Sequence, residues 1–232
     1  MDIQVIGSGS SGNAYRISDG RTTILLDCGL SIAKLQAATG YTISTLDACL
    51  ITHSHQDHCK AHRDIVRLGV DIYTHLDTIV QMRGVGHRYR PIVHNRQFTV
   101  DTLNILPFDL VHDVINTGWL IYSNVTGEKL LYVTDTMYLP YRFTGVTHWL
   151  IEANNALEAM EENVEAGTLN RGLKHRIQKS HMSIQTLLDI FAANDMSKTE
   201  QIYLIHLSDD NSRADDFRDR VEKATGAHVI VC

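Results

Sequence analysis

The chain has 232 residues, a formal net charge of −6 and 44% hydrophobic residues, which fits one large domain or two small ones with a sizeable core. The acidic total argues against a protein built to hold a long nucleic acid, although local basic clusters and metal ions can still accommodate a small nucleotide. No stretch approaches the ~20 apolar residues of a membrane span and the N-terminus lacks a basic signal region, so we expect a cytoplasmic protein with no membrane partner, whose four cysteines are free thiols.

The first predicted elements surround a glycine-rich loop. Residues 2–6 read as a strand, and Gly7-Ser8-Gly9-Ser10-Ser11-Gly12 then matches the pattern G-x-G-x-x-G. In dinucleotide-binding proteins a helix follows this pattern. Here residues 14–18 and 22–26 look like two strands joined by the hairpin signal Asp19-Gly20. We therefore interpret the glycines as a tight strand-to-strand loop, in preference to a dinucleotide site.

The stretch Thr52-His53-Ser54-His55-Gln56-Asp57-His58 is the strongest chemical signal in the chain. The apolar run before it reads as a buried strand. Because alternate residues of an extended segment point to the same side, His53 and His55 can bind one metal ion together. Asp57 and His58 come just past the turn and suit a second ion. The spacing therefore predicts a two-metal site, and it differs from the helical H-E-x-x-H arrangement of the zincins.

The remaining elements alternate between strands and helices. A helix capped by Ser31 is expected to end at Gly40, and another is expected to run from the histidine motif to about Leu68. Strands are predicted at residues 70–73, 103–108, 119–123, 129–134, 149–151, 201–205 and 228–231, and helices at 155–163, after Ser183, and at 211–224 with Ala214, Phe217 and Val221 facing inward. Strands in groups, interleaved with helices, indicate an α/β sandwich.

Candidate ligands and active-site groups stand at the ends of the later strands. They are His112, Asp135, Glu152 and His206. A further histidine, His181, stands just before a predicted helix N-terminus, where backbone N–H groups favour an anion such as phosphate.

Two basic stretches are also prominent. Arg83–Arg90 contains two glycines and reads as a loop, which is either a solvated connector or a contact for a substrate or partner. The second, Lys174–Lys179, comes directly before Ser180 and His181.

With these residues collected, the chain resembles the phosphodiesterase branch of the metallo-β-lactamase superfamily over nearly its whole length. The family's H-x-H-x-D-H motif, its later single His, its bridging Asp and its last His stand here as His53, His55, Asp57, His58, His112, Asp135 and His206. The resemblance implies a single domain over residues 1–232, an αββα sandwich in which two central mixed sheets are flanked by helices.

Two groups within the superfamily are the most similar. YycJ-type proteins share the opening Gly-Ser-Gly-Ser-Ser-Gly-Asn, and the tRNase Z group carries segments that look like Glu152-Ala153 and Ile205-His206. Phage anti-Pycsar enzymes, which hydrolyse cyclic nucleotides, belong to the same neighbourhood, and such a phage protein would act in the host cytoplasm. The chain departs from YycJ-type proteins at Asn154-Asn155-Ala156, where they carry Asn-His-Asp, and it has no room for the clamping arm of tRNase Z.

The resemblance also implies a set of metal ligands. One ion would take His53, His55 and His112, the second would take Asp57, His58 and His206, and Asp135 would bridge them. Imidazole and carboxylate ligands suit Zn²⁺, with Mn²⁺ or Fe²⁺ as alternatives. Two divalent ions held ~3.5–4 Å apart can hold phosphate oxygens during in-line attack.

The expected catalytic residues are Asp57, His181 and Glu152. The leaving alkoxide needs a proton, and we assign its donation to His181, polarised by Glu152. The alternative for His181 is a helix-capping or core histidine. Asp27, which closes its strand, is expected to orient a metal-bound histidine.

Three functions follow as hypotheses. The first, favoured by the acidic total and the missing clamp, is hydrolysis of a small phosphodiester, most readily a cyclic mononucleotide such as cCMP or cUMP. The second is an RNA or DNA nuclease of the YycJ or tRNase Z type, with the two basic stretches gripping the backbone. The third is a metal-binding regulatory module without turnover, against which the complete ligand set speaks. Because related phosphodiesterases are often homodimers, a homodimer is also expected.

Overall fold

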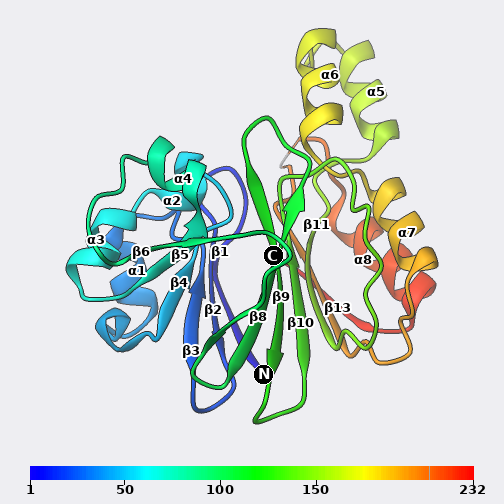
Figure 1. The fold of residues 1–232 in the computed structure, drawn as a ribbon. Coiled ribbons are helices and arrows are strands. Elements are labelled where there is room, and N and C mark those ends of the chain that lie inside the picture. Colours follow the sequence, from blue (N-terminus) through cyan, green and yellow to red (C-terminus); the bar gives the residue numbers. More distant parts are fainter. Residues whose placement is uncertain (209) are drawn as a thin grey trace. The chain divides into compact units, whose positions relative to one another are not determined.

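The structure is a computed structural model that describes residues 1–208 and 210–232. Its strands form two mixed sheets, one of six strands and one of seven, with helices beside them (Figure 1), which confirms the predicted α/β fold class. The chain divides into two compact units: residues 1–109 with 114–128, and residues 110–113 with 129–232. Within the described ranges, every helix is too short or too polar to cross a bilayer.

The first unit contains nine strands and four α-helices. Their bounds are β1 Asp2–Gly7, β2 Ala14–Ser18, β3 Thr23–Leu26, α1 Ile32–Ala38, β4 Ala48–Leu50, α2 Gln56–Cys59, α3 His62–Arg67, β5 Ile72–His75, α4 Leu76–Gln81, β6 Tyr89–Ile92, β7 Phe98–Val100, β8 Leu103–Leu110 and β9 Asn116–Ser123. Strands β1 to β6 form the six-stranded sheet in chain order. The first three strands pair antiparallel, and β3 to β6 pair parallel.

Several local predictions for this unit are confirmed. The glycine pattern forms the loop between β1 and β2, and β2 and β3 make the predicted hairpin. Ser31 caps α1, because its side chain accepts a hydrogen bond from the Lys34 N–H. Cys28, Cys49 and Cys59 are buried free thiols.

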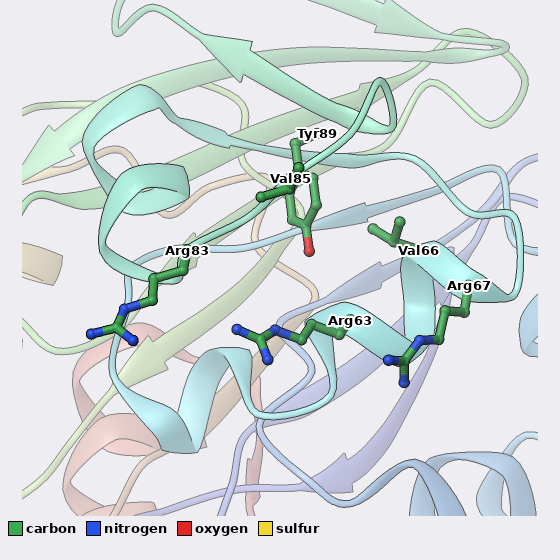
Figure 2. A pocket seen from close by; sticks show the side chains of 6 residues that line it. All are labelled: Arg63, Val66, Arg67, Arg83, Val85 and Tyr89. Carbon is green, nitrogen blue, oxygen red and sulfur yellow. The ribbon is translucent and has the colours of Figure 1, made fainter.

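The prediction of one continuous helix after the histidine motif is wrong. The segment contains two short helices, α2 and α3. The Ala61 N–H donates to the Cys28 carbonyl at 2.9 Å, outside the helix, and Ala61 occupies the N-cap position of α3 instead. The Arg83–Arg90 stretch is also not wholly a loop, because Tyr89 and Arg90 begin β6. A pocket of about 340 Å³ lies beside α3 and this stretch (Figure 2).

A buried carboxylate joins the β2–β3 hairpin to more distant parts of the first unit. Asp19 accepts hydrogen bonds from the backbone N–H groups of Arg21 and Thr22, and from the hydroxyls of Thr102 and Ser123, both at 2.7 Å. Burial by itself would raise the pKa of Asp19, but these hydrogen bonds lower it to about 2.

In its described residues, the second unit contains four strands and four helices. Their bounds are β10 Lys129–Val133, β11 His148–Glu152, α5 Leu157–Glu165, α6 Arg171–Ser180, α7 Ile184–Ala193, β12 Gln201–Ile205, α8 Ala214–Thr225 and β13 His228–Val231. The strands pair parallel in the order β10-β11-β12-β13. Strands β10 and β12 each bury a run of four consecutive residues and β11 buries all five, as parallel strands covered on both faces do.

The helices of the second unit fall into two pairs that pack differently. Helices α7 and α8 pack against each other, and the ring of Phe191 on α7 meets Trp149 of β11 edge-on at 5.5 Å. Helices α5 and α6 lie side by side and project away from these strands (Figure 1). The basic stretch Lys174–Lys179 lies within α6, which buries no residue.

The prediction for the last helix needs one correction. Helix α8 begins at Ala214, which is exposed and not directed inward as expected. Phe217 and Val221 are fully buried, as predicted. Ala214 occupies the first helical position, where the helix has not yet reached the core.

The Asp19 network generates a pH-dependent prediction. The pKa of about 2 in the folded state is below the usual value of 3.8, so Asp19 stabilises the fold above pH 3.8, and the effect is lost as the pH falls toward 2. We expect Asp19→Asn to lower the free energy of unfolding by about 1–2 kcal/mol at pH 7, measured by urea denaturation. The difference from wild type should shrink between pH 4 and pH 2.5. Asp189→Asn, at an exposed position of α7, is the control, and equal losses in both variants would contradict the assignment.

Candidate metal centre

Parallel pairing in the first unit sets the position of its metal-binding motif. Strands β3 and β4 pair in register, with Leu26 opposite Leu50, so the two strands end at the same edge of the sheet. Asp27 follows β3 directly, and Thr52 and His53 follow β4 within three residues. The carboxyl ends of parallel strands are where open α/β sheets bind ligands.

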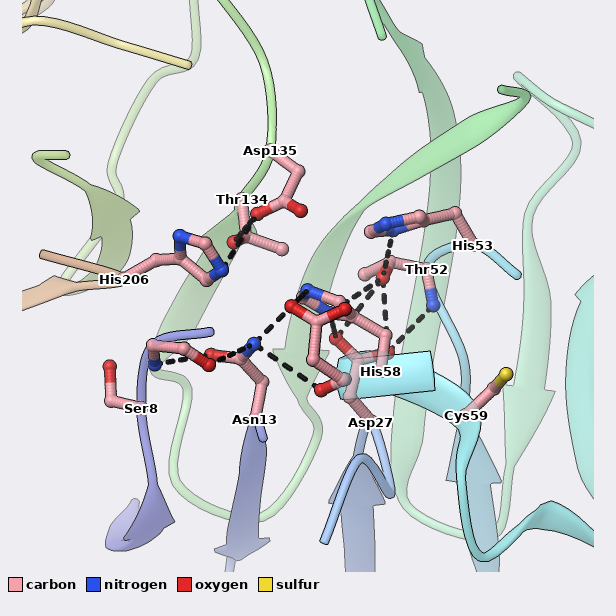
Figure 3. A network of polar contacts seen from close by, with 12 residues as sticks. Ser8, Asn13, Asp27, Thr52, His53, His58, Cys59, Thr134, Asp135 and His206 are labelled. Atoms are coloured by element: carbon pink, nitrogen blue, oxygen red, sulfur yellow. Dashed lines mark hydrogen bonds and ion pairs between the residues drawn. The ribbon is translucent and has the colours of Figure 1, made fainter. Parts of the chain in front are cut away.

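The buried carboxylate of Asp27 orients two histidines of the motif (Figure 3). His58 donates from Nδ1 to Asp27 at 2.7 Å. Thr52 donates to the same carboxylate from its backbone N–H, at 2.8 Å, and from its hydroxyl, whose oxygen lies 3.0 Å from Nδ1 of His53. With Nδ1 of both rings used in this way, Nε2 carries the lone pair that can bind a metal.

The glycine-rich loop packs directly on the motif. The backbone N–H of Asn13 donates to the Asp57 carbonyl at 2.7 Å, and its side-chain amide nitrogen lies 3.0 Å from Nε2 of His58. A Cβ on Gly29 would lie only 1.6 Å from the carbonyl oxygen of Asp57. This approach requires glycine, so Gly29 allows the segment after β3 to pack against the motif.

The four motif residues are brought together within the first unit. The ring of His53 lies 4.6 Å from that of His55 and 4.3 Å from that of His58, measured between centroids. A carboxylate oxygen of Asp57 lies 3.4 Å from Nε2 of His58. His53 and His58 are fully buried, and the carboxylate of Asp57 is half-buried beside them.

The second unit gathers its candidates by the same means. Strands β10, β11 and β12 are parallel and in register, with Val133 opposite Ile151 and Ile151 opposite Leu204. Their carboxyl ends therefore reach one edge together. The residues at that edge are Asp135, Glu152 and His206.

Asp135 stands at the centre of this second cluster. Its carboxylate oxygens lie 3.4 Å from Nε2 of His206 and 3.9 Å from Nε2 of His112. Asp135 and His206 both have left-handed backbone conformations, with φ of 53° and 55°, and Asp27 in the first unit has φ of 56°. Such conformations are unfavourable for residues with a side chain and concentrate at functional sites.

Glu152 binds three donors from two turns. It accepts hydrogen bonds from the backbone N–H groups of Thr136, at 3.0 Å, and Met182, at 3.2 Å, and its other oxygen lies 2.5 Å from Nδ1 of His181. The His181 ring stacks on His206, with centroids 5.3 Å apart and planes 14° apart. Glu152 is fully buried. The structure therefore brings Glu152 and His181 together, as predicted, and places the pair beside His206, a candidate metal ligand.

Three residues that hold the candidate ligands in place were not predicted from the sequence. They are Asn13, Thr52 and Asn154. The Asn154 amide donates to the His206 carbonyl at 2.9 Å, and its backbone N–H donates to the Met182 carbonyl, so it ties the His206 and His181 turns together. Their positions beside recognised motifs were the available signal, because Asn13 ends the glycine loop and Thr52 opens the histidine motif.

The donor set fits transition-metal ions. Asp135, Glu152, His181 and His206 each offer a ligand atom, and these atoms lie within 4.8 Å of one another. Since Glu152 and His181 already bind each other, Asp135 and His206 are the members best placed for an ion. Carboxylate and imidazole donors are the chemistry that Zn²⁺, Mn²⁺ and Fe²⁺ accept.

The role of Asp27 is testable. Asp27→Asn leaves the size of the side chain unchanged but removes the charge that holds His58 and Thr52. We expect metal affinity, measured by competition with a chromophoric chelator, to fall about 10–100-fold. Asp77→Asn, at an exposed carboxylate of the same unit, should have wild-type affinity. Wild-type affinity in Asp27→Asn would show that Asp27 does not support a metal ligand.

Curated relatives match most of the chain. Exodeoxyribonuclease WalJ from Streptococcus pneumoniae (strain D39) is 29% identical over 227 residues, which cover 90% of this chain and 82% of the relative. Exodeoxyribonuclease YycJ from Bacillus anthracis is 27% identical over 231 residues, covering 91% and 84%. Anti-Pycsar protein Apyc1 from Bacillus phage 010DV004 is 33% identical over only 72 residues, 25% of each chain.

A solved structure supports the fold. The metallo-β-lactamase fold protein YhfI from Bacillus subtilis superimposes with a TM-score of 0.74, covering 99% of this chain and 95% of its own at 18% identity. Residues 22–207 match the family described as the Beta-lactamase superfamily domain. The expectations of a metallo-β-lactamase fold and of a metal-dependent phosphodiester hydrolase are confirmed. The chain belongs to the β-lactamase superfamily.

Proposed function

We propose that this protein is a metal-dependent exodeoxyribonuclease, in which the two units form one catalytic domain. The observation that carries phosphodiester hydrolysis is the Glu152–His181 pair, 2.5 Å apart and stacked beside His206. DNA as the substrate is supported by relatives that match 90% of the chain and are exodeoxyribonucleases.

In this proposal the cofactor is a pair of divalent ions, most simply Zn²⁺. The proposed ligands are His53, His55 and His112 for one ion, Asp57, His58 and His206 for the other, and Asp135 as the bridge. When bound, the ions supply Lewis-acid stabilisation of the phosphate oxygens in the transition state. Asp27 and Thr52 fix the imidazoles of the first unit, which reduces the reorganisation that binding requires.

The protein's own groups manage the leaving-group proton. Nδ1 of His181 is engaged by Glu152, so the proton for the leaving alkoxide comes from Nε2. The two backbone N–H groups on Glu152 prevent its carboxylate from turning away. Buried beside an imidazole, the carboxylate stabilises the imidazolium that must be present before proton donation.

A cyclic nucleotide is the second candidate substrate. The acidic composition favoured it over a nuclease, and the similarity to Apyc1 supports it, but over 25% of the chain only. The relatives that match nearly the whole chain reverse the order of the two hypotheses. A homodimer stays a prediction, which light scattering at micromolar concentration can test.

The substrate class is decided by a direct comparison. Metal-loaded protein is incubated with 3′,5′- and 2′,3′-cyclic nucleotides, single-stranded DNA and RNA of equal phosphate concentration. We expect mononucleotides to appear fastest from DNA. Faster hydrolysis of a cyclic mononucleotide would establish the second candidate instead.

The role of His181 is tested with two kinds of leaving group. His181→Ala should retain wild-type metal content, because His181 is not a proposed ligand, and should lose about 10²–10⁴-fold in turnover of DNA. The loss should be much smaller with bis(p-nitrophenyl) phosphate, whose leaving group needs no proton. Glu152→Gln should show a milder form of the same pattern. Equal losses on both substrates would mean that His181 binds phosphate, and no loss would leave it a capping residue.

The bridging role of Asp135 is tested by metal analysis. Purified wild-type protein is expected to carry close to two transition-metal ions per chain. Asp135→Ala should lose most of one equivalent and the activity together, measured by elemental analysis after dialysis. Full metal content in this variant would contradict the bridge.

A further inference from the structure

The pocket of the first unit contains none of the proposed metal ligands. Its volume of about 340 Å³ lies at the lower end of the ~300–1,000 Å³ typical of small-ligand sites. Three cations, two small apolar side chains and a phenol line it: Arg63, Val66, Arg67, Arg83, Val85 and Tyr89. The described lining therefore contains no acidic side chain.

The charge of this pocket is not balanced by the protein. Among the described residues, Arg63 and Arg83 have no carboxylate partner, and only Arg67 is paired, with Asp64 at 3.2 Å. Like charges gathered at one cavity repel one another, and an anion bound between them relieves the repulsion. The chain carries a net charge of −6, so this local excess of positive charge runs against its composition.

The neighbouring arginines of the basic stretch show the contrast. Arg88 and Arg90 each bind the carboxylate of Asp71 at 2.8 Å. Burial would raise the pKa of Asp71, but these hydrogen bonds hold it below its usual value, so Asp71 is charged at neutral pH. Asp71 thus neutralises part of the Arg83–Arg90 stretch and leaves Arg83 for the pocket.

The backbone that carries Arg83 is held in an unfavourable conformation. Arg83 has φ of 54°, in the left-handed region that residues with a side chain rarely adopt. The next residue is Gly84, where a Cβ would lie 2.8 Å from the ring of Tyr89. The close approach of Gly84 to this ring fixes the path of the loop and the direction in which Arg83 leaves it. Strain of this kind is typical of binding sites.

Tyr89 forms a fixed wall of the pocket. Its hydroxyl lies 2.8 Å from Nδ1 of the buried His62 and points toward Arg63, with Val66 and Val85 on either side (Figure 2). Burial, and then the charge of Arg63, lower the pKa of His62, so this imidazole is neutral and its Nδ1 can accept a hydrogen bond from the Tyr89 hydroxyl. This contact fixes the Tyr89 side of the pocket.

The pocket is connected to the metal-binding motif through two short links. Helix α3, which carries Arg63 and Arg67, follows α2 of the motif after Lys60 and Ala61. On the other side, the hydroxyl of Ser54, between the first two motif histidines, donates to the Gln81 side chain at the end of α4, two residues before Arg83. These two links place the pocket near the motif within the first unit, so a DNA strand that extends from the motif can reach it.

The geometry points to a second nucleotide-binding subsite, in which Arg63 and Arg83 bind a backbone phosphate of the DNA strand and the valines contact its sugar. This inference rests on the proposed nuclease function. Guanidinium groups bind phosphate oxygens in pairs and remain charged at every physiological pH. A strand held here and at the metal centre would be gripped at two points along its length.

The inference is tested by binding, separately from cleavage. Metal-loaded protein is titrated against a fluorescent phosphorothioate single strand, which resists hydrolysis, at 50 to 300 mM salt. We expect Arg63→Gln and Arg83→Gln each to weaken binding about tenfold at low salt. The double variant Arg63→Gln/Arg83→Gln should also reduce the slope of log K against log [salt] by about 0.7, which corresponds to the one phosphate that the two arginines share on a single strand.

Two controls isolate the pocket. Arg142→Gln removes the same charge from an exposed position in the other unit and should bind within twofold of wild type. Hydrolysis of bis(p-nitrophenyl) phosphate should be unchanged in the pocket variants, because this small substrate needs only the metal centre. Inorganic phosphate should compete with the strand for wild type more strongly than for the double variant.

The outcomes separate the inference from the function. If wild type cleaves DNA but the double variant binds the strand like wild type, or if Arg142→Gln is equally impaired, the subsite is wrong and the nuclease function stands. If wild type binds the strand but releases no nucleotide, the function is wrong, and the binding of the pocket variants still decides the subsite. If wild type neither binds nor cleaves, both are overturned.

Discussion

The buried carboxylate of Glu152 holds the candidate active site of the second unit together. A fully buried charge is unfavourable unless donors surround it, and here two backbone N–H groups and an imidazole do so. The donors come from the turn after Asp135 and from the turn that contains His181. Removing this one carboxylate would leave both turns without their common acceptor.

The first unit uses the same physical device in a different place. Asp27 stands at the end of β3, is fully buried, and accepts hydrogen bonds from the backbone of Thr52 and the ring of His58. Each carboxylate therefore joins the ends of neighbouring strands or turns and sets which nitrogen of a histidine is protonated. That choice matters for metal binding, because only the unprotonated nitrogen can be a ligand.

The two carboxylates above are buried, whereas the arginines of the described chain lie mainly on the surface. Several arginines of the described chain lie on the surface beside a carboxylate, as Arg88 and Arg90 do with Asp71. Such exposed pairs contribute little to stability. Arg63 and Arg83 are different because they share a pocket that contains no acid, and the Arg83 backbone is strained. A protein with a net charge of −6 can bind a polyanion only where its charges are sorted in this way.

The sequence by itself determined the fold class, the metal motif and the pairing of Glu152 with His181. These could be predicted because ligand spacing in His53 to His58 is local, and because polar residues after apolar runs mark the ends of strands. Helix caps such as Ser31 and Ser183 were equally local. Short-range chemistry and strand periodicity were sufficient for the motif and the caps, whereas the pairing of Glu152 with His181, 29 positions apart, followed from the resemblance to a known family.

Only the tertiary structure decided how distant segments support these residues. The break between α2 and α3 depends on a carbonyl of Cys28, and the roles of Asn13 and Asn154 depend on partners 44 and 52 positions away. The pocket joins α3 to a loop about twenty residues later through the contact of Gly84 with the ring of Tyr89. Hydrogen-bond partners and close approaches of this kind are set by the path of the folded backbone, which residue spacing does not encode.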